Sequence, residues 1–120
     1  MAKGKSDTAK NILNKAIELN PKYLSSYSIM AGILVAQGNL QKAEFFLKKS
    51  LEINPKDINA LVNLACVLKD SGNPMQAEKF LKDALKINPN YDFALTNLGA
   101  VLNELEKFDE GEQYLSLIHI

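Results

Sequence analysis

The sequence repeats itself every 34 residues over most of its 120-residue length. Pro21, Pro55 and Pro89 are separated by that interval, and the six-residue segments that end in them align without gaps. The same step relates several other columns, namely Gly4, Gly38 and Gly72; Ala9, Ala43 and Ala77; Leu13, Leu47 and Leu81; and Ala31, Ala65 and Gly99. Such self-similarity predicts structural units that each pack on their neighbours along the chain.

Each period has the apolar spacing of two helices. Leu61, Leu64 and Leu68 follow the i, i+3, i+7 pattern of one helical stripe, and a second stripe follows around Leu81. Gly72 between them suits the left-handed turn that ends a helix, and Pro74 suits a first turn. Asp57 and Asn73 are predicted N-caps, acting through their side chains. The sequence therefore predicts an all-α chain with helices at 6–19, 25–37, 40–53, 58–71, 74–87, 92–105 and 108–119.

Small residues recur beside large ones, which predicts close approach of packed helices. Ala31, Ala65 and Gly99 each follow a large apolar residue, as expected where two backbones come together. The last repeat departs from the pattern, because Glu106 stands in the column of the turn glycines and Gly111 in an alanine column. Each departure costs about 1 kcal/mol, so the last helix pair is predicted to be the least stable.

This pattern resembles the tetratricopeptide repeat family over residues 4–114. The resemblance implies a right-handed α-α superhelix, a solenoid of antiparallel helix pairs with a concave groove lined mainly by the first helix of each pair. The expected organisation is a single repeat domain over residues 1–120. It comprises a half repeat at 4–23, repeats at 24–57, 58–91 and 92–114, and a tail at 115–120.

The function that this resemblance implies is a scaffold that binds a protein or an extended peptide in the concave groove. The chain is expected to be no enzyme and to need no cofactor. The alternative is a substrate-recognition arm of a larger glycosyltransferase-like or other transferase enzyme, whose catalytic domain lies outside this sequence. A third possibility is self-association through uncapped ends.

By analogy with the family, we expect eight residues to line the peptide-binding groove: Asn59, Val62, Asn63, Cys66, Phe93, Thr96, Asn97 and Ala100. This surface is mostly small and neutral, which favours a partner without strong charge. Asn63 and Asn97 are equivalent, and an amide can both donate to and accept from a peptide backbone. Ile29 interrupts this ladder in the first repeat, and the alternative role for the asparagines is local packing. Cys66 is expected to be a small filler.

Composition and charge exclude several other functions. Fourteen lysines balance fourteen carboxylates and there is no arginine, which argues against nucleic acid or an anionic membrane as a partner. One cysteine and one histidine, His119, cannot form a zinc site. The longest apolar run, residues 29–36, is too short to span a membrane, and the polar N-terminus is no signal peptide. A cytoplasmic location is expected.

The two ends of the sequence predict a fragment of a longer array. Gly4 is already at the expected inter-helix turn, and no polar capping helix follows the last repeat. The sequence Leu-Ser-Leu-Ile-His-Ile at residues 115–120 is also what the end of a common sequencing-library adapter would encode. We hypothesise that this tail is translated adapter; the alternative is a natural apolar C-terminus.

Overall fold

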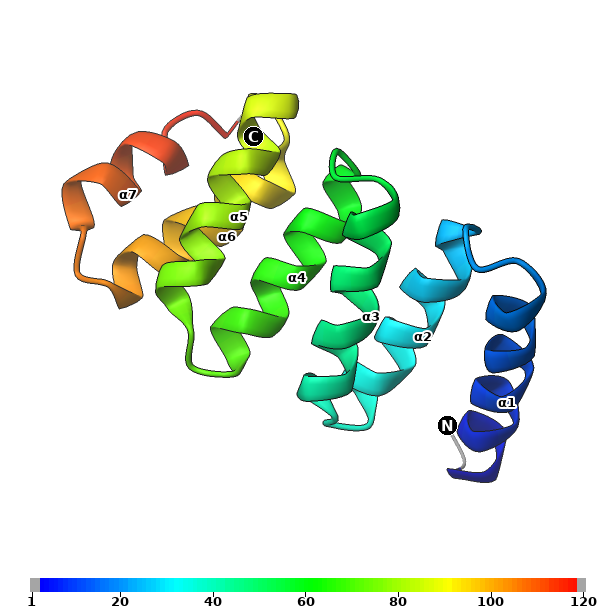
Figure 1. The fold of residues 1–120 in the computed structure, drawn as a ribbon. Helices are drawn as coiled ribbons and strands as arrows, with labels where there is room; N and C mark the ends of the chain where they lie inside the picture. Colours follow the sequence, from blue (N-terminus) through cyan, green and yellow to red (C-terminus); the bar gives the residue numbers. More distant parts are fainter. Residues whose placement is uncertain (1–2, 119–120) are drawn as a thin grey trace. The chain divides into compact units, whose positions relative to one another are not determined.

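The computed structural model describes residues 3–118, and within them the chain forms seven α-helices and no strand (Figure 1). The helices are α1 (Lys3–Leu19), α2 (Leu24–Ala36), α3 (Leu40–Ile53), α4 (Ile58–Asp70), α5 (Pro74–Ile87), α6 (Asp92–Glu104) and α7 (Phe108–Leu115). They fall into two compact units. Unit 1 runs to Pro55 and holds α1 to α3, and unit 2 begins at Lys56 and holds α4 to α7.

Unit 1 is a helix hairpin with one additional helix. α2 and α3 pack on each other, and α1 packs on α2. Met30 and Leu34 of α2 and Leu47 of α3 are at most 2% exposed, whereas Leu13 of α1 is only half-buried. Since Leu13 and Leu47 occupy the same repeat column, the difference reflects the packing on α2, which is less extensive for α1 than for α3.

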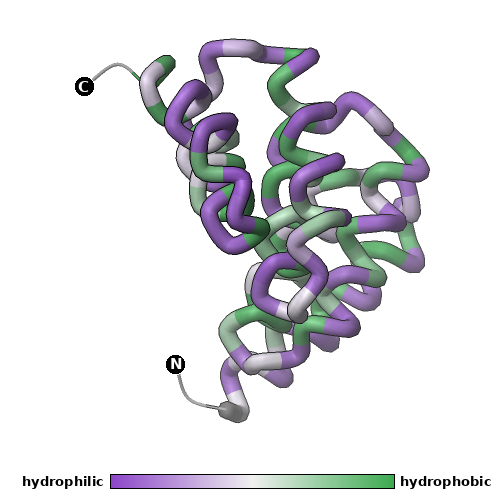
Figure 2. Tube along the Cα trace, turned by 90° about the vertical axis from the view of Figure 1, so that its left-hand side faces the viewer, coloured by the Kyte–Doolittle hydropathy of each residue, from purple (hydrophilic) through white to green (hydrophobic). Residues whose placement is uncertain are grey.

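Unit 2 contains two helix hairpins, α4–α5 and α6–α7, and α6 packs on both helices of the first one. Its core is formed by the columns that the repeat predicts, and the following residues are 0% exposed: Leu64, Ala65, Leu68, Ala77, Leu81, Ala84, Leu95, Leu98 and Leu102. Hydrophobic and hydrophilic residues alternate along the helices in Figure 2, as expected for helices with one buried face. The predicted core of these two repeats is therefore confirmed.

The turn inside each helix pair has the same backbone geometry in all three repeats. Gly38, Gly72 and Glu106 have positive φ angles of 76°, 86° and 63°. The residue after each turn donates its amide to a carbonyl five residues earlier at 2.8 Å, in the bonds Asn39–Leu34, Asn73–Leu68 and Lys107–Leu102. Glu106 thus adopts the left-handed conformation that glycine tolerates best, as its column predicts.

The helix caps agree with expectation at one position and differ at another. The Asp57 side chain accepts a hydrogen bond from the Ala60 amide at 3.4 Å, so its predicted capping role is confirmed. Asn73 occupies its predicted N-cap position before α5, but its side chain makes no capping bond. Its backbone carbonyl instead accepts from Ala77, and Pro74 leaves the first helical position of α5 without an amide to satisfy.

Both terminal helices differ from the predicted bounds. Gly4 lies within α1, which begins at Lys3, rather than in the predicted turn, so its backbone is helical and not in the left-handed conformation of Gly38 and Gly72. α7 ends at Leu115 rather than at 119. The Ser116 amide still bonds four residues back, to Glu112, whereas the amides of Leu117 and Ile118 bond three residues back. The Ser116 hydroxyl donates to the Gln113 carbonyl at 2.7 Å, and together these bonds close the helix with a tight turn. Residues 119–120, including His119, lie outside the described residues, and the origin of the tail stays a hypothesis.

The small residues of α6 and α7 allow the closest helix contact of the last pair. A Cβ atom placed on Gly99 would lie 2.5 Å from Cδ2 of Leu115, so the leucine occupies the space that a side chain would need. Gly111 is buried on the other helix, and a Cβ there would meet the Gly99 carbonyl oxygen at 3.5 Å. The close approach predicted from this column is confirmed for this pair.

A network of ion pairs joins the outer surfaces of α5 and α7. Nζ of Lys82 lies 2.8 Å from Glu78 and 2.7 Å from Glu110, and Nζ of Lys107 lies 3.0 Å from Glu78. Burial alone would raise the pKa of Glu78, but hydrogen bonds from the two lysines outweigh it and hold that pKa below its ordinary value. The hydrogen bonds that Lys82 donates, first to Glu110 and then to Glu78, raise the pKa of Lys82. The network therefore favours the charged form of both groups.

Candidate peptide-binding site

The residues predicted for the groove lie on α4 and α6, the first helices of the two pairs in unit 2. Asn59, Asn63 and Cys66 follow i, i+4, i+7 spacing and therefore share one side of α4. The same spacing places Phe93, Asn97 and Ala100 on one side of α6, and Thr96 lies one helical turn from both Phe93 and Ala100. We define the α4–α6 face as the side chains of Asn59, Asn63, Cys66, Phe93, Thr96, Asn97 and Ala100.

Two side-chain hydrogen bonds bring these helices together along the face. The hydroxyl of Tyr91, just before α6, donates to Oδ1 of Asn59 at 3.0 Å. Further along, Sγ of Cys66 donates to Oδ1 of Asn97 at 3.4 Å. Both bonds connect residues about one repeat apart in sequence, so the stacking of one repeat on the next assembles this surface.

The predicted residues differ in exposure. Asn59, Asn63, Phe93, Thr96 and Ala100 are exposed, and Cys66 and Asn97 are half-buried. The placement of Val62 in the groove is wrong, because its side chain is 0% exposed. Its equivalent one repeat later, Thr96, is exposed. The difference arises because α6 packs against α4 and covers Val62, whereas no equivalent helix covers α6 among residues 3–118. Val62 therefore belongs to the core of unit 2.

The two equivalent asparagines differ in their bonding. Nδ2 of Asn97 donates to the Phe93 carbonyl of its own helix at 2.7 Å, while its Oδ1 accepts from Cys66. The Asn63 amide is exposed and has no hydrogen-bond partner within residues 3–118. An amide with donor and acceptor both available can pair with a peptide unit of any sequence. Asn63 is therefore better placed to bind a ligand, and Asn97 holds the local structure.

Cys66 behaves as a packing and hydrogen-bonding residue. Burial raises the pKa of its thiol, and the opposing effect of the nearby Lys69 is smaller. The protonated thiol is the form that can donate to Asn97, and it is a weak nucleophile. The side chain is half-buried and bonded to its neighbour. These features agree with the filler role that the sequence predicts.

Phe93 adds an apolar element to an otherwise polar surface. Its side chain is 47% exposed, and its ring meets Tyr91 edge to face, with centroids 6.2 Å apart. The Tyr91 ring is in turn held by the hydroxyl bond to Asn59. A ligand crossing the face would thus meet a fixed aromatic pair beside the free amide of Asn63.

A pocket that sequence reasoning missed adjoins the face on its α6 side. It has a volume of about 370 Å³ and is lined from α6 by Thr96 and Ala100, and from α7 by Phe108 and Leu115, among others. Phe108 is 55% exposed and Leu115 is 44% exposed. The signal was present in the sequence as large apolar residues opposite the small residues of α6.

Metal chemistry and membrane insertion receive no support from the described residues. No group of three or more His, Cys, Asp or Glu side chains within residues 3–118 is arranged to hold a metal ion. In the same part of the chain, none of the helices has both the length and the apolar character that crossing a membrane requires.

Comparison with known proteins identifies the type of repeat. A family model described as "Tetratricopeptide repeat" matches residues 1–65, and one described as "Anaphase-promoting complex, cyclosome, subunit 3", also of tetratricopeptide type, matches residues 36–117. No curated protein matches the sequence significantly.

Solved structures of MamA share the fold. A crystal structure of MamA is 20% identical, covers 96% of this chain and 67% of its own, and superposes with a TM-score of 0.87. The structure titled "MamA MSR-1 C2" is 20% identical, covers 95% and 66%, and gives 0.79. MamA from Desulfovibrio magneticus RS-1 is 14% identical, covers 94% and 64%, and gives 0.83. The chain thus spans about two thirds of the length of these MamA chains. The high TM-scores and the seven helices of residues 3–118 confirm the predicted all-α repeat fold class.

Proposed function

Because the chain belongs to the tetratricopeptide repeat family, we propose that it binds a protein partner through an extended peptide segment laid across the α4–α6 face. Family membership supports protein–protein interaction as the general role. The observation that carries the specific site is the exposed and unbonded amide of Asn63, on a face where Cys66 is bonded to Asn97 and Asn59 to Tyr91. A peptide backbone supplies the complementary donor and acceptor.

The face also favours a particular kind of peptide. Its residues are neutral, and the exposed ring of Phe93 offers an apolar contact. A charged ligand side chain would find no counter-ion among the seven residues of the face. The ligand in this proposal is therefore a segment without strong charge that pairs its backbone with Asn63 and places an apolar side chain against Phe93. A cytoplasmic setting and the absence of catalysis by this chain belong to the same proposal.

The test uses a phage-displayed library of random peptides selected on the intact chain. The affinity of a selected peptide is then measured by fluorescence anisotropy for the natural chain and for Asn63→Ala. We expect binding to weaken about fivefold, since one hydrogen bond contributes about 1 kcal/mol, with an unchanged melting temperature. Gln76→Ala, which removes an exposed amide from α5, is the matched control and should leave affinity unchanged.

The asparagine in the equivalent column sharpens this test. Asn97→Ala removes two internal hydrogen bonds and should lower the melting temperature as well as the affinity. The proposal fails if Asn63→Ala and Gln76→Ala have the same effect on affinity, or if Asn63→Ala weakens folding as much as Asn97→Ala does.

A further inference from the structure

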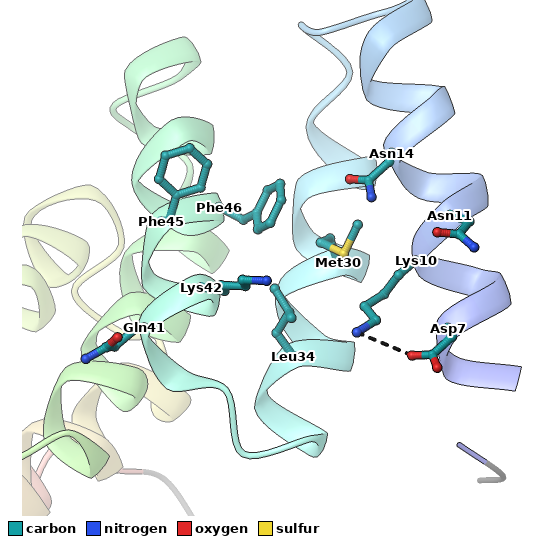
Figure 3. Close-up of a pocket in the computed structure, with 10 residues that line it drawn as sticks. All are labelled: Asp7, Lys10, Asn11, Asn14, Met30, Leu34, Gln41, Lys42, Phe45 and Phe46. Carbon is teal, nitrogen blue, oxygen red and sulfur yellow. Dashed lines mark ion pairs between the residues drawn. The ribbon is translucent and has the colours of Figure 1, made fainter. Parts of the chain in front are cut away.

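Unit 1 contains a larger pocket, which is separate from the α4–α6 face. It has a volume of about 660 Å³ and lies between α1 and α3 with α2 beneath (Figure 3). We call it the α1–α3 groove. Sequence reasoning assigned no role to it, because its rim residues fall in repeat columns that normally form the solvated outer surface and its floor residues fall in core columns.

The floor and one wall of the groove are apolar. Met30 and Leu34 of α2 are each 2% exposed and form the floor. On α3, Phe45 is 55% exposed and meets the half-buried Phe46 edge to face, with centroids 5.4 Å apart. These rings leave an apolar recess open to solvent, which fits a large aliphatic or aromatic side chain.

The rim of the groove carries unused polar groups. Lys10 is engaged, since its Nζ lies 3.6 Å from Asp7 and donates to Gln37 at 3.0 Å. Lys42 reaches from α3 towards α2 in Figure 3 and has no ion-pair partner within residues 3–118. Asn11 and Asn14 of α1 likewise have no hydrogen-bond partner there. The rim thus offers one unpaired cation and two free amides above an apolar floor.

The charge of the chain is divided between its two units. Residues 1–55 contain eight lysines and four carboxylates, a formal net charge of +4, whereas residues 56–120 contain six lysines and ten carboxylates, a net charge of −4. The neutrality of the whole chain hides this division. Unit 1 therefore attracts an acidic ligand, and Lys42 gives that attraction a fixed position at the groove.

We propose that the α1–α3 groove is a second binding site, which takes an acidic, extended segment of a partner protein with a large apolar side chain as its anchor. The anchor enters the recess over Met30 and Leu34, and a neighbouring carboxylate pairs with Lys42. An extended segment fits better than a helix of a second copy, because its free peptide groups can pair with Asn11 and Asn14. The backbone groups of a helix are already bonded to one another.

The test uses three fluorescein-labelled peptides and the intact chain. The first is Glu-Glu-Phe-Glu-Glu, the second replaces Phe by Ala, and the third replaces every Glu by Gln. We expect the first to bind with the highest affinity in anisotropy titrations, and its binding to weaken as salt increases. Equal binding of all three peptides, or no binding of the first at millimolar chain concentration, would overturn the proposal.

Two charge-reversal variants locate the site. Lys42→Glu should weaken the first peptide about tenfold, and its fold should persist because an acidic residue is favourable three residues after the cap Asn39. Lys22→Glu makes the same charge change in an exposed loop of unit 1 and should have less than about twofold effect. An equal loss of affinity in the two variants would show that only the net charge of unit 1 matters, and it would contradict a specific site at Lys42.

Two further measurements separate the other outcomes. Asn63→Ala should leave binding of the acidic peptide unchanged, so a failure of the α4–α6 proposal does not remove this one. Sedimentation velocity of the natural chain and of Lys42→Glu tests the second copy as occupant. A dimer that disappears in Lys42→Glu would show that another copy fills the groove, and the proposal would then be wrong.

Discussion

Two outer surfaces of this molecule occupy equivalent places in the repeat and differ in the ion pairs that cross them. In unit 2, the surfaces of α5 and α7 are joined by Glu78 to Lys107 and by Lys82 to Glu110. Two repeats earlier, 68 residues back, Lys10 and Asn14 stand for Glu78 and Lys82, and Lys42 stands for Glu110. Those residues cannot form the same pairs, and the α1–α3 groove remains open.

The comparison shows that one repeat scaffold can carry two different surfaces. The columns beneath both surfaces are apolar, with Met30 and Leu34 in unit 1 and Leu98 and Leu102 in unit 2. Only the outer columns change, from a complementary set of charges to two lysines and an amide, of which Lys42 and Asn14 have no side-chain partner within residues 3–118. Packing therefore fixes the helices, while a few surface positions decide whether a groove is bridged or available to a ligand.

The largest expected difference between the units lies in the core. Leu81→Ala removes a side chain that is 0% exposed and should lower the free energy of unfolding by about 3 kcal/mol. Leu13→Ala in the same column, on half-buried α1, should lower it by about 1 kcal/mol. Urea unfolding followed by circular dichroism measures both. Equal losses would mean that α1 is as well packed as α5.

The ion-pair network should matter next, and it should depend on pH. Glu78→Gln should destabilise unit 2 by about 1 kcal/mol at pH 7, because its side chain is only 12% exposed and has two lysine partners. Lys10→Gln in unit 1, where the ion pair is longer, should change stability by less than about 0.5 kcal/mol. Urea unfolding again measures both variants.

The sign of the pH dependence follows from the lowered pKa of Glu78. A carboxyl group with a lower pKa in the folded state adds stability above its ordinary pKa of 4.5, and this is lost as pH falls through the folded value. The natural chain should lose more stability than Glu78→Gln between pH 7 and pH 3. The raised pKa of Lys82 also adds stability, but this contribution is lost as pH rises, and only in strongly alkaline solution. Parallel pH profiles for the two chains would contradict the network.

Substitutions in the turn inside each helix pair should change stability in opposite directions in the two units. Glu106→Gly should stabilise unit 2 by about 1 kcal/mol, because Glu106 has a φ of 63° in the left-handed region. Gly38→Ala should destabilise unit 1 by a similar ~1 kcal/mol, since its φ is 76° and the space around it is open, so conformation alone is tested. Thermal unfolding should move in opposite directions for these variants, and a shift in the same direction would contradict this account.

The sequence was sufficient for most of the fold because the repeat ties many columns to one helical pattern. It placed the turn at Glu106 and the buried Leu81 without any coordinates. The prediction from sequence failed where the burial or conformation of a residue depends on which repeat it belongs to and not only on its place within the repeat. Val62 and Thr96 are equivalent, yet the first is buried and the second exposed, and Gly4 is helical although Gly38 and Gly72 in its column form turns.

The candidate sites were less predictable than the fold. Equivalence of Asn63 and Asn97 suggested a ladder, but the bonds of Asn97 to Cys66 and Phe93 depend on side-chain positions that spacing does not specify. The α1–α3 groove was missed because Phe45 and Lys42 occupy outer columns, where exposed apolar and charged residues are common. Comparing residues 68 positions apart would have revealed that the charge pairs of unit 2 are absent there.

A further small effect concerns a buried hydroxyl. Oγ of Ser50 in α3 has no hydrogen-bond partner within residues 3–118, whereas its equivalent in α5 is Ala84. Ser50→Ala should stabilise unit 1 by about 0.5–1 kcal/mol, because burying an unpaired hydroxyl is unfavourable and alanine is the better helix former. Ala84→Ser is the reciprocal change and should destabilise unit 2. Differential scanning calorimetry measures both, and a lower melting temperature for Ser50→Ala would show that the hydroxyl is satisfied.

Backbone chemical-shift mapping tests the central claim most directly. The ¹⁵N-labelled chain is titrated with a peptide selected from the random library, and amide shifts are followed for α4, α5 and α6. We predict that the largest changes fall around Asn59, Asn63 and Phe93, with little change along the outer side of α5. Changes confined to the outer side of α5, with none on the α4–α6 face, would contradict the account.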